Sequence, residues 1–272
     1  MCRIGVLFFE RDVGALDREE IACRILENGY RMGNRDGVGL AQFSGKRIDR
    51  VAALTLYDLF RSLAPLRLNR TVLLHARLST NRVDIHHTQP LLMGDTVAIA
   101  HNGVVSGFSK SVEESCQTKN DSERIAAAYL LARAKSLSRA ESLKESLEQA
   151  TGLANVLMLD STGGKKSLLI YPDSEPFLSI EGDGWVAIVQ EERQVEGLRY
   201  KVGGTYPAGK VYEWDFGVSA YVGKPLSVKR PKTSLYSYGA YGSYYHYATG
   251  AALLTDEDKR EYEILRSVSG GE

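Results

Sequence analysis

Cys2 is the most promising nucleophile in this sequence, because it directly follows the initiator methionine. Removal of Met1 would place a thiol and a free α-amine on one residue. An α-amine, with a pKa near ~8, is partly neutral at physiological pH and can act as the base that a thiol needs. Many chains begin with Met-Cys without catalytic use, so the remaining residues must decide between a nucleophile and an ordinary terminus.

Two polar clusters follow apolar, strand-like runs, where loops hold functional groups on a rigid scaffold. In residues 75–81, Arg77 is suited to grip a carboxylate with two parallel hydrogen bonds, the alternative being a surface ion pair. At Asn102 and Gly103, predicted to end an apolar strand, a side-chain amide and a backbone N–H can point at one oxygen. An oxyanion needs such an arrangement, although Asn-Gly also forms plain turns.

A third cluster, residues 120–123, opens a predicted helix. Asp121 is either the N-cap of that helix or a carboxylate that receives the ammonium group of a ligand. The histidines do not stand at the Glu/His i,i+4 spacing of a zinc site, and no Cys-x-x-Cys occurs. We therefore expect no metal and no cofactor.

The elements that must position these residues alternate between helical and strand-like periodicity. Helices bracketed by runs of strands predict an α+β fold with two sheets and helices packed on them, and not a doubly wound parallel sheet. The predicted helices cover residues 17–32, 49–63, 121–136, 138–150 and 255–267. The predicted strands cover residues 4–9, 40–43, 71–76, 96–101, 153–159, 167–171, 176–180, 184–189, 198–202 and 210–214.

Composition excludes several classes of function. The 272 residues carry 34 basic and 34 acidic side chains, so the formal net charge is zero. Neither nucleic acid nor a membrane surface is therefore an expected partner, since both require clustered positive charge. We see no apolar run that would span a membrane and no secretory signal. Three cysteines are too few for a disulfide framework, which predicts a cytoplasmic protein.

In combination, these clusters resemble the glutaminase domain of class II glutamine amidotransferases, which are N-terminal-nucleophile hydrolases. The resemblance runs in order over most of residues 2–125. It rests on Cys2, Tyr30…Asp36-Gly37-Val38-Gly39-Leu40-Ala41, His75-Ala76-Arg77-Leu78-Ser79-Thr80, His87-Thr88-Gln89-Pro90, His101-Asn102-Gly103 and Asn120-Asp121-Ser122-Glu123. The chain departs from the family pattern at Arg3, where a glycine is usual, and at Leu78, where a tryptophan is usual.

The resemblance implies a catalytic set of Cys2, Asn102 and Gly103. Cys2 would attack the side-chain amide of L-glutamine, and the other two would hold the oxyanion. Arg77, Thr80 and Asp121 would bind the substrate, Arg77 through its α-carboxylate and Asp121 through its α-ammonium group. A thioester would form, ammonia would leave, and water would release glutamate. The implied fold is a four-layer αββα sandwich.

The resemblance predicts an amidotransferase domain over residues 2–222. Residues 223–272 would form a linker, a Tyr/Gly-rich tract and a terminal helix, too short for a synthase that uses the ammonia. Three interpretations stay open. The chain could supply ammonia to a separate acceptor enzyme, with the tract as a docking or self-association segment. It could hydrolyse a γ-glutamyl or other small amide. It could be a non-catalytic scaffold.

Overall fold

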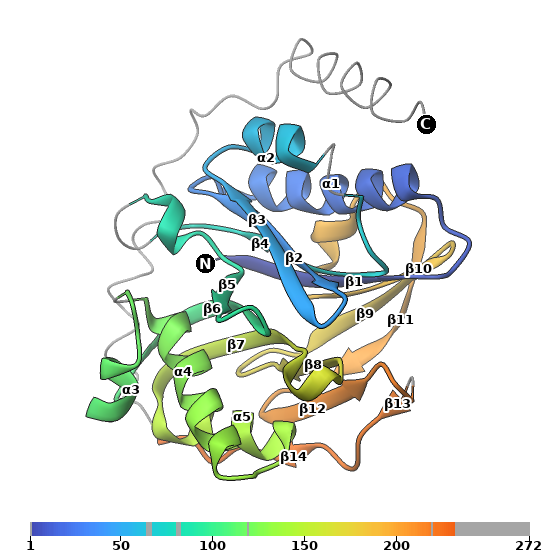
Figure 1. Ribbon diagram of the computed structural model, residues 1–272. Helices are drawn as coiled ribbons and strands as arrows, with labels where there is room; N and C mark the ends of the chain where they lie inside the picture. Colours follow the sequence, from blue (N-terminus) through green and yellow to red (C-terminus); the bar gives the residue numbers. More distant parts are fainter. Residues whose placement is uncertain (1, 64–66, 80–82, 119, 219, 232–272) are drawn as a thin grey trace.

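Two antiparallel seven-stranded sheets stack face to face between two layers of helices (Figure 1). The computed structural model describes residues 2–63, 67–79, 83–118, 120–218 and 220–231. Three separate apolar clusters account for the layering: one under each helical layer and one between the sheets. The predicted four-layer αββα sandwich is thus confirmed.

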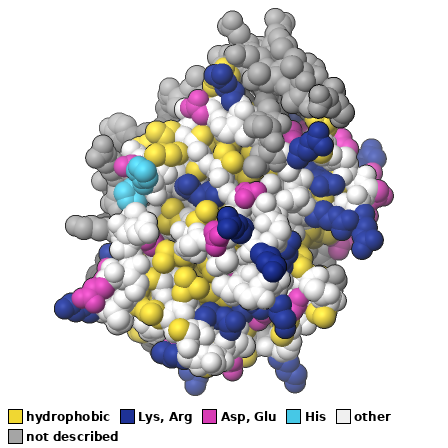
Figure 2. Space-filling model, viewed as in Figure 1, with side chains coloured by type: hydrophobic (Ala, Val, Ile, Leu, Met, Phe, Trp, Pro, Cys, Tyr) yellow, Lys and Arg dark blue, Asp and Glu magenta, His cyan; other side chains and the backbone are white. Residues whose placement is uncertain are grey.

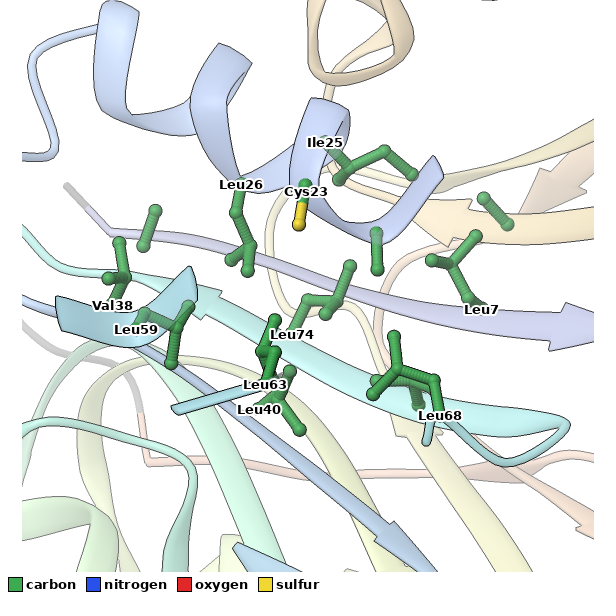
Figure 3. Close-up of a cluster of buried hydrophobic side chains, with 14 of the residues drawn as sticks. Leu7, Cys23, Ile25, Leu26, Val38, Leu40, Leu59, Leu63, Leu68 and Leu74 are labelled. Atoms are coloured by element: carbon green, nitrogen blue, oxygen red, sulfur yellow. The ribbon is translucent and has the colours of Figure 1, made fainter. Parts of the chain in front are cut away.

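The first sheet places the N-terminal strand in its middle. Leu7 and Phe9 of β1 pack against the helices, whereas Ile4 and Val6 face the other sheet. This alternation is what a strand buried on both faces requires. Figure 3 shows the helix-side cluster, in which Cys23 is one of the buried core side chains. In sheet order the strands are β11(Tyr200–Tyr206), β9(Phe177–Gly182), β10(Trp185–Val189), β1(Arg3–Phe9), β4(Thr71–Ala76), β2(Val38–Ser44) and β3(Arg47–Ala53), covered by α1(Ala15–Arg31) and α2(Leu56–Leu63).

The second sheet is built around the long β6–β7 pair. Its strands are β13(Ala220–Tyr221), β12(Lys210–Asp215), β8(Ser167–Tyr171), β7(Thr151–Asp160), β6(Val97–Ser106) and β5(Leu91–Met93), with β14(Leu226–Ser227) paired to β12. The helices on this side are α3(Lys110–Glu114), α4(Asp121–Ala134) and α5(Arg139–Gln149). Ser138 caps α5 in a reciprocal capping box with Glu141, so the expected start of this helix is confirmed.

One predicted helix is half wrong. Residues 49–63 were expected to be helical, but Arg47–Ala53 forms β3, which pairs with β2 along its whole length. Only Leu56–Leu63 is helical. A two-residue turn at Gly45 and Lys46, with Gly45 at φ +60°, joins β2 and β3 into a hairpin. Pairing with β2 outweighs the helical spacing of the apolar residues.

The surface carries no dominant charge on the face shown in Figure 2, where basic and acidic side chains are interspersed with neutral and apolar ones. Among the described helices, none combines the length and the apolar character that crossing a bilayer requires. The predicted helix at 255–267 and the Tyr/Gly-rich tract lie outside the described residues. The described chain up to residue 231 still contacts the sandwich, since Arg230 forms an ion pair of 2.7 Å with Asp173.

Candidate active site

Cys2 lies at the start of the central strand of the first sheet. It immediately precedes β1, whose Arg3 pairs with Ala76 of β4. The Cys2 thiol is partly buried, and its Sγ donates to the Leu78 carbonyl oxygen at 3.5 Å. Burial raises the pKa of the thiol above its ordinary value. At physiological pH the group is therefore a thiol, and a base is required to make it a nucleophile.

Arg77 directly follows β4 and is held by the turn that precedes β2. Its backbone N–H donates to Gly37 O at 2.8 Å, and its carbonyl accepts from Asp36 N at 3.0 Å. The Arg77 side chain is buried, and Nη2 donates to Ser79 Oγ at 3.0 Å. The Asp36 carboxylate accepts from Ser79 N at 2.7 Å, which closes the loop. Asp36 belongs to the turn motif quoted above, but its role as the anchor of this loop was not predicted.

Asn102 and Gly103 lie inside β6 and not at its end, which corrects the predicted placement. β6 continues to Ser106 because β7 pairs with it along its whole length. Gly103 has φ +152°, and a Cβ built there would lie 2.0 Å from the Leu153 carbonyl oxygen. Only glycine permits this approach of the two strands. The pair is thus a feature of a strand and not a hairpin turn.

Asp121 is the first residue of α4, and the N-cap is its neighbour Asn120. One oxygen of Asp121, Oδ2, accepts from the backbone N–H of Val105 at 3.0 Å. The other, Oδ1, lies 3.9 Å from Nδ1 of His101, and about a quarter of the side chain is exposed. Asp121 is therefore tied to β6 two residues beyond Gly103, with part of its carboxylate open to a ligand.

A buried hydrogen-bond network joins β6 to α4, and sequence reasoning did not predict it. Gln89 accepts from the His101 backbone N–H at 2.6 Å and donates to Ser122 Oγ at 2.8 Å. Ser122 Oγ also lies 3.1 Å from His101 Nδ1. All three residues belong to the family-like segments, which is the signal that could have indicated them. The network sets the position of β6, and with it Asn102, relative to Asp121.

His75 is completely buried in β4. Burial lowers its pKa to about 3, so the imidazole is neutral at physiological pH. Neither ring nitrogen has a hydrogen-bond partner among the described residues. His75 therefore contributes a neutral, buried ring next to the Arg77 loop.

The predicted site residues converge although they come from both sheets and from α4. The charges of Arg77 and Asp121 both act on the Cys2 thiol, Arg77 lowering and Asp121 raising its pKa, each less than burial does. Gln190 joins Asn102 to the N-terminal strand, because its side-chain oxygen accepts from both Asn102 and Ile4. Thr80, the remaining predicted site residue, lies outside the described residues.

A small cleft of about 50 Å³ lies beside these groups, with Arg3, Asn102, Asn155 and Gln190 in its lining. A larger cleft of about 390 Å³ is lined by tyrosines of β11, β12 and β13 and contains none of the predicted site residues. Among the described residues, no three His, Cys, Asp or Glu side chains form a group that could hold a metal ion. Of the predicted site residues, Asn102 lines the small cleft, and Arg3, the neighbour of Cys2, lies beside it there. The region around Cys2, Arg77, Asn102 and Asp121, which borders this cleft, is the candidate active site.

Comparison with known proteins supports the fold. No protein-family model and no curated protein matches the sequence. Solved structures do match. Glutamine phosphoribosylpyrophosphate amidotransferase from B. subtilis has a TM-score of 0.64 at 15% identity over 85% of this chain and 50% of its own. An allosteric regulatory enzyme of purine biosynthesis has a TM-score of 0.63 at 17% identity, over 84% of this chain and 50% of its own.

A third structure has a similar length. A glutamine aminotransferase class-II domain protein from Silicibacter pomeroyi has a TM-score of 0.52 at 13% identity, over 85% of this chain and 100% of its own. This chain thus spans about half the length of the first two structures and all of the third. At these identities the likeness establishes the fold.

Proposed function

We propose that this chain, which has the fold of glutamine amidotransferase domains, hydrolyses L-glutamine to glutamate and ammonia through a thioester on Cys2. The observation that carries the proposal is the set of chemical groups gathered around the Cys2 thiol. The thiol lies 3.5 Å from the carbonyl oxygen of Leu78, the residue after Arg77, and the charges of Arg77 and Asp121 both act on it. Gln190 joins the Asn102 amide to the strand that follows Cys2. Shared fold supports the proposal but does not select the reaction.

The first chemical step depends on removal of Met1. The freed α-amine of Cys2 would take the thiol proton, which is needed because burial raises the pKa of that thiol. Sulfur would then attack the side-chain carbonyl carbon of glutamine. The carbonyl π electrons would move to oxygen, where the Asn102 amide and the Gly103 N–H would stabilise the negative charge.

Collapse of this intermediate would break the C–N bond. The α-ammonium group would return its proton to the leaving nitrogen, so that ammonia departs and a thioester remains. Water would then attack the thioester, with the same amine as base, and release glutamate and the thiol. Arg77 would bind the substrate α-carboxylate and Asp121 its α-ammonium group, and Thr80 is the third proposed substrate-binding residue.

The decisive experiment compares glutamate release by the wild type, Cys2→Ala and Cys116→Ala. We expect Cys2→Ala to lose at least about 10³-fold in kcat, because the covalent step has no other nucleophile. Cys116 is the matched control. Cys116 follows α3, its thiol donates to Val112 O within that helix, and burial raises the pKa of the thiol to about 11. Cys116→Ala should keep wild-type activity.

Intact-mass measurement of the wild type accompanies the assay and should show the loss of Met1. Glutamate release at the wild-type rate by Cys2→Ala would refute the thioester mechanism. A γ-glutamyl or other small amide is the alternative substrate, and the same Cys2→Ala comparison on such amides separates a hydrolase of another specificity from a non-catalytic scaffold.

The ammonia would pass to a separate acceptor enzyme in a cytoplasmic setting. Among the described residues, Cys2, Cys23 and Cys116 form no disulfide, which suits a reducing compartment. The Tyr/Gly-rich tract is the proposed docking or self-association segment. A chain ending at residue 231 should keep glutaminase activity. It should lose either binding to the acceptor enzyme or the self-association that light scattering measures. A shortened chain that keeps both partner binding and self-association would argue against this role of the tract.

A further inference from the structure

Gln190, the residue after β10, bridges the strand of the nucleophile and the proposed oxyanion residue. Its Oε1 accepts from the backbone N–H of Ile4 at 3.1 Å. The same oxygen accepts from Nδ2 of Asn102 at 3.1 Å. Ile4 lies two residues after Cys2, so one side-chain oxygen joins the first sheet, the second sheet and the N-terminal segment.

This bridge settles which way the Asn102 amide points. A backbone N–H can only donate, so the Gln190 atom that faces Ile4 must be the carbonyl oxygen. The Asn102 atom that meets this oxygen must then be the NH₂ group. Oδ1 of Asn102 is buried and has no hydrogen-bond partner in the described part of the chain. No hydrogen bond of this oxygen therefore favours the opposite orientation of the amide. One N–H of Asn102 is bound to Gln190, and the second is left for a substrate oxygen.

Neighbouring contacts hold the same segment without contacting Asn102. Gln194 donates to Ile4 O at 3.2 Å, and its Oε1 accepts from Gln190 N at 3.0 Å. Arg3 donates to Cys2 O at 3.1 Å and forms an ion pair of 2.6 Å with Glu191. Arg3, where the family-like pattern has glycine, thus folds back onto the terminus. These residues anchor the N-terminal segment, whereas Gln190 alone of this group also contacts the oxyanion side chain.

Resting on the function proposed above, we infer that Gln190 is a positioning residue for the oxyanion site. It aims the NH₂ group of Asn102 and sets its distance from Cys2. Because Oε1 of Gln190 already accepts from Ile4 and Asn102, its loss should lower kcat more than it changes KM for glutamine.

A double-mutant cycle in the full chain tests this inference. Gln190→Met keeps the side-chain length but removes the acceptor, and we expect kcat to fall about 10- to 100-fold, as for a misplaced catalytic group. Asn102→Ala should cost about 10²–10³-fold in kcat. In the Asn102→Ala background, Gln190→Met should change kcat by less than about twofold, because its effect acts through Asn102. An equal fall in both backgrounds would overturn the inference.

Glu192→Gln is the matched control. Glu192 lies in the same turn, is exposed, and accepts a hydrogen bond from the Tyr200 hydroxyl at 2.8 Å. Its kcat should stay within about twofold of the wild type, since an exposed charge contributes little. A fall equal to that of Gln190→Met would show that any loosening of this turn suffices and would overturn the specific role of Gln190.

A second readout separates this inference from the proposed function. In protein labelled with ¹⁵N-asparagine, the Asn102 side-chain amide is identified by its loss in Asn102→Ala. We expect its resonance to shift in Gln190→Met and to stay in place in Glu192→Gln. An unshifted resonance in Gln190→Met would overturn the bridge. A wild type that releases no glutamate would refute the proposed function, while the amide resonance would still decide the bridge.

Discussion

Opposing charges surround the Cys2 thiol, and this arrangement suits an amino-acid substrate. Arg77 and Asp121 both affect the pKa of the thiol, in opposite directions. An α-amino acid carries a carboxylate and an ammonium group on one carbon, which one cation and one anion can bind together. The effects of these two charges on the pKa of the thiol oppose each other. Deprotonation would then depend on the α-amine of Cys2.

Asp121→Asn tests the ammonium contact at the level of a single atom. The amide oxygen of asparagine can still accept from Val105 N–H, so the fold should be retained. Loss of the charge should lower kcat/KM for glutamine about 10- to 100-fold, the effect of about 1.5–3 kcal/mol for a charged hydrogen bond. Glutaramate, which lacks the ammonium group, should show little change.

The control for this prediction is Asp95→Asn. Asp95 forms an exposed ion pair with Arg47 and should not affect kinetics when its charge is removed. Steady-state rates with both substrates provide the measurement. An equal loss on glutamine and glutaramate in Asp121→Asn would place the role of Asp121 in folding or in the chemical step.

At the scale of the element, β6 carries most of the proposed chemistry. Its pairing with β7 runs without interruption past Asn102 and Gly103, and its far end is bound to α4 through Val105 and Asp121. A rigid strand positions the oxyanion group more accurately than a turn would. The close approach of β7 is the reason that residue 103 is glycine.

Gly103→Ala should therefore be strongly destabilising. The added Cβ would meet the Leu153 carbonyl at 2.0 Å. We expect a loss of at least about 3 kcal/mol in the free energy of unfolding, measured by urea denaturation. Gly197→Ala is the control, because Gly197 has φ +82° and no atom within 4 Å of an added Cβ. It should cost about 1–2 kcal/mol, from backbone conformation alone. Equal losses of unfolding free energy in the two variants would mean that β7 moves away from the added Cβ at little cost.

At the scale of the whole molecule, the folding equilibrium should depend on pH, because the imidazole of His75 is buried in its neutral form. The pKa of His75 is about 3 in the folded chain and about 6.5 when unfolded. Below pH 6.5 the unfolded chain therefore binds a proton that the folded chain does not. The contribution of neutral His75 to the unfolding free energy is complete above about pH 6.5, the pKa of the side chain in the unfolded chain. This contribution is lost as the pH falls toward 3, by up to about 1.4 kcal/mol per pH unit.

His75→Met removes this titration while keeping an apolar side chain of similar size. Relative to His75→Met, the wild type should lose about 2 kcal/mol of unfolding free energy between pH 6.5 and pH 5, as measured by urea denaturation. His86→Met, at an exposed position on the turn at Ile85–His87, should keep the wild-type pH dependence. Parallel pH profiles for the wild type and His75→Met would indicate that His75 is protonated equally in both states.

Local sequence was sufficient for most of the elements and for a short set of candidate reactive groups. Periodicity predicted α1, α4, α5 and most strands, because burial on one face repeats with the period of the element. Residue chemistry singled out Cys2, Arg77, Asn102 and Asp121, since few side chains can act as a nucleophile, bind a carboxylate or stabilise an oxyanion. The helical spacing at 49–63 misled the prediction where a hairpin with β2 competed.

Tertiary structure decided what depends on residues far apart in the chain. Gln190 meets Asn102 across 88 positions, and Asp36 meets Ser79 across 43. Such contacts leave no periodic pattern, because they arise only when two sheets stack and loops from different strands meet at one edge. The sequence by itself determined which groups could react. The stacking of the sheets decided that Asn102 points its NH₂ group at Gln190, and pairing with β7 decided that Gly103 lies within a strand.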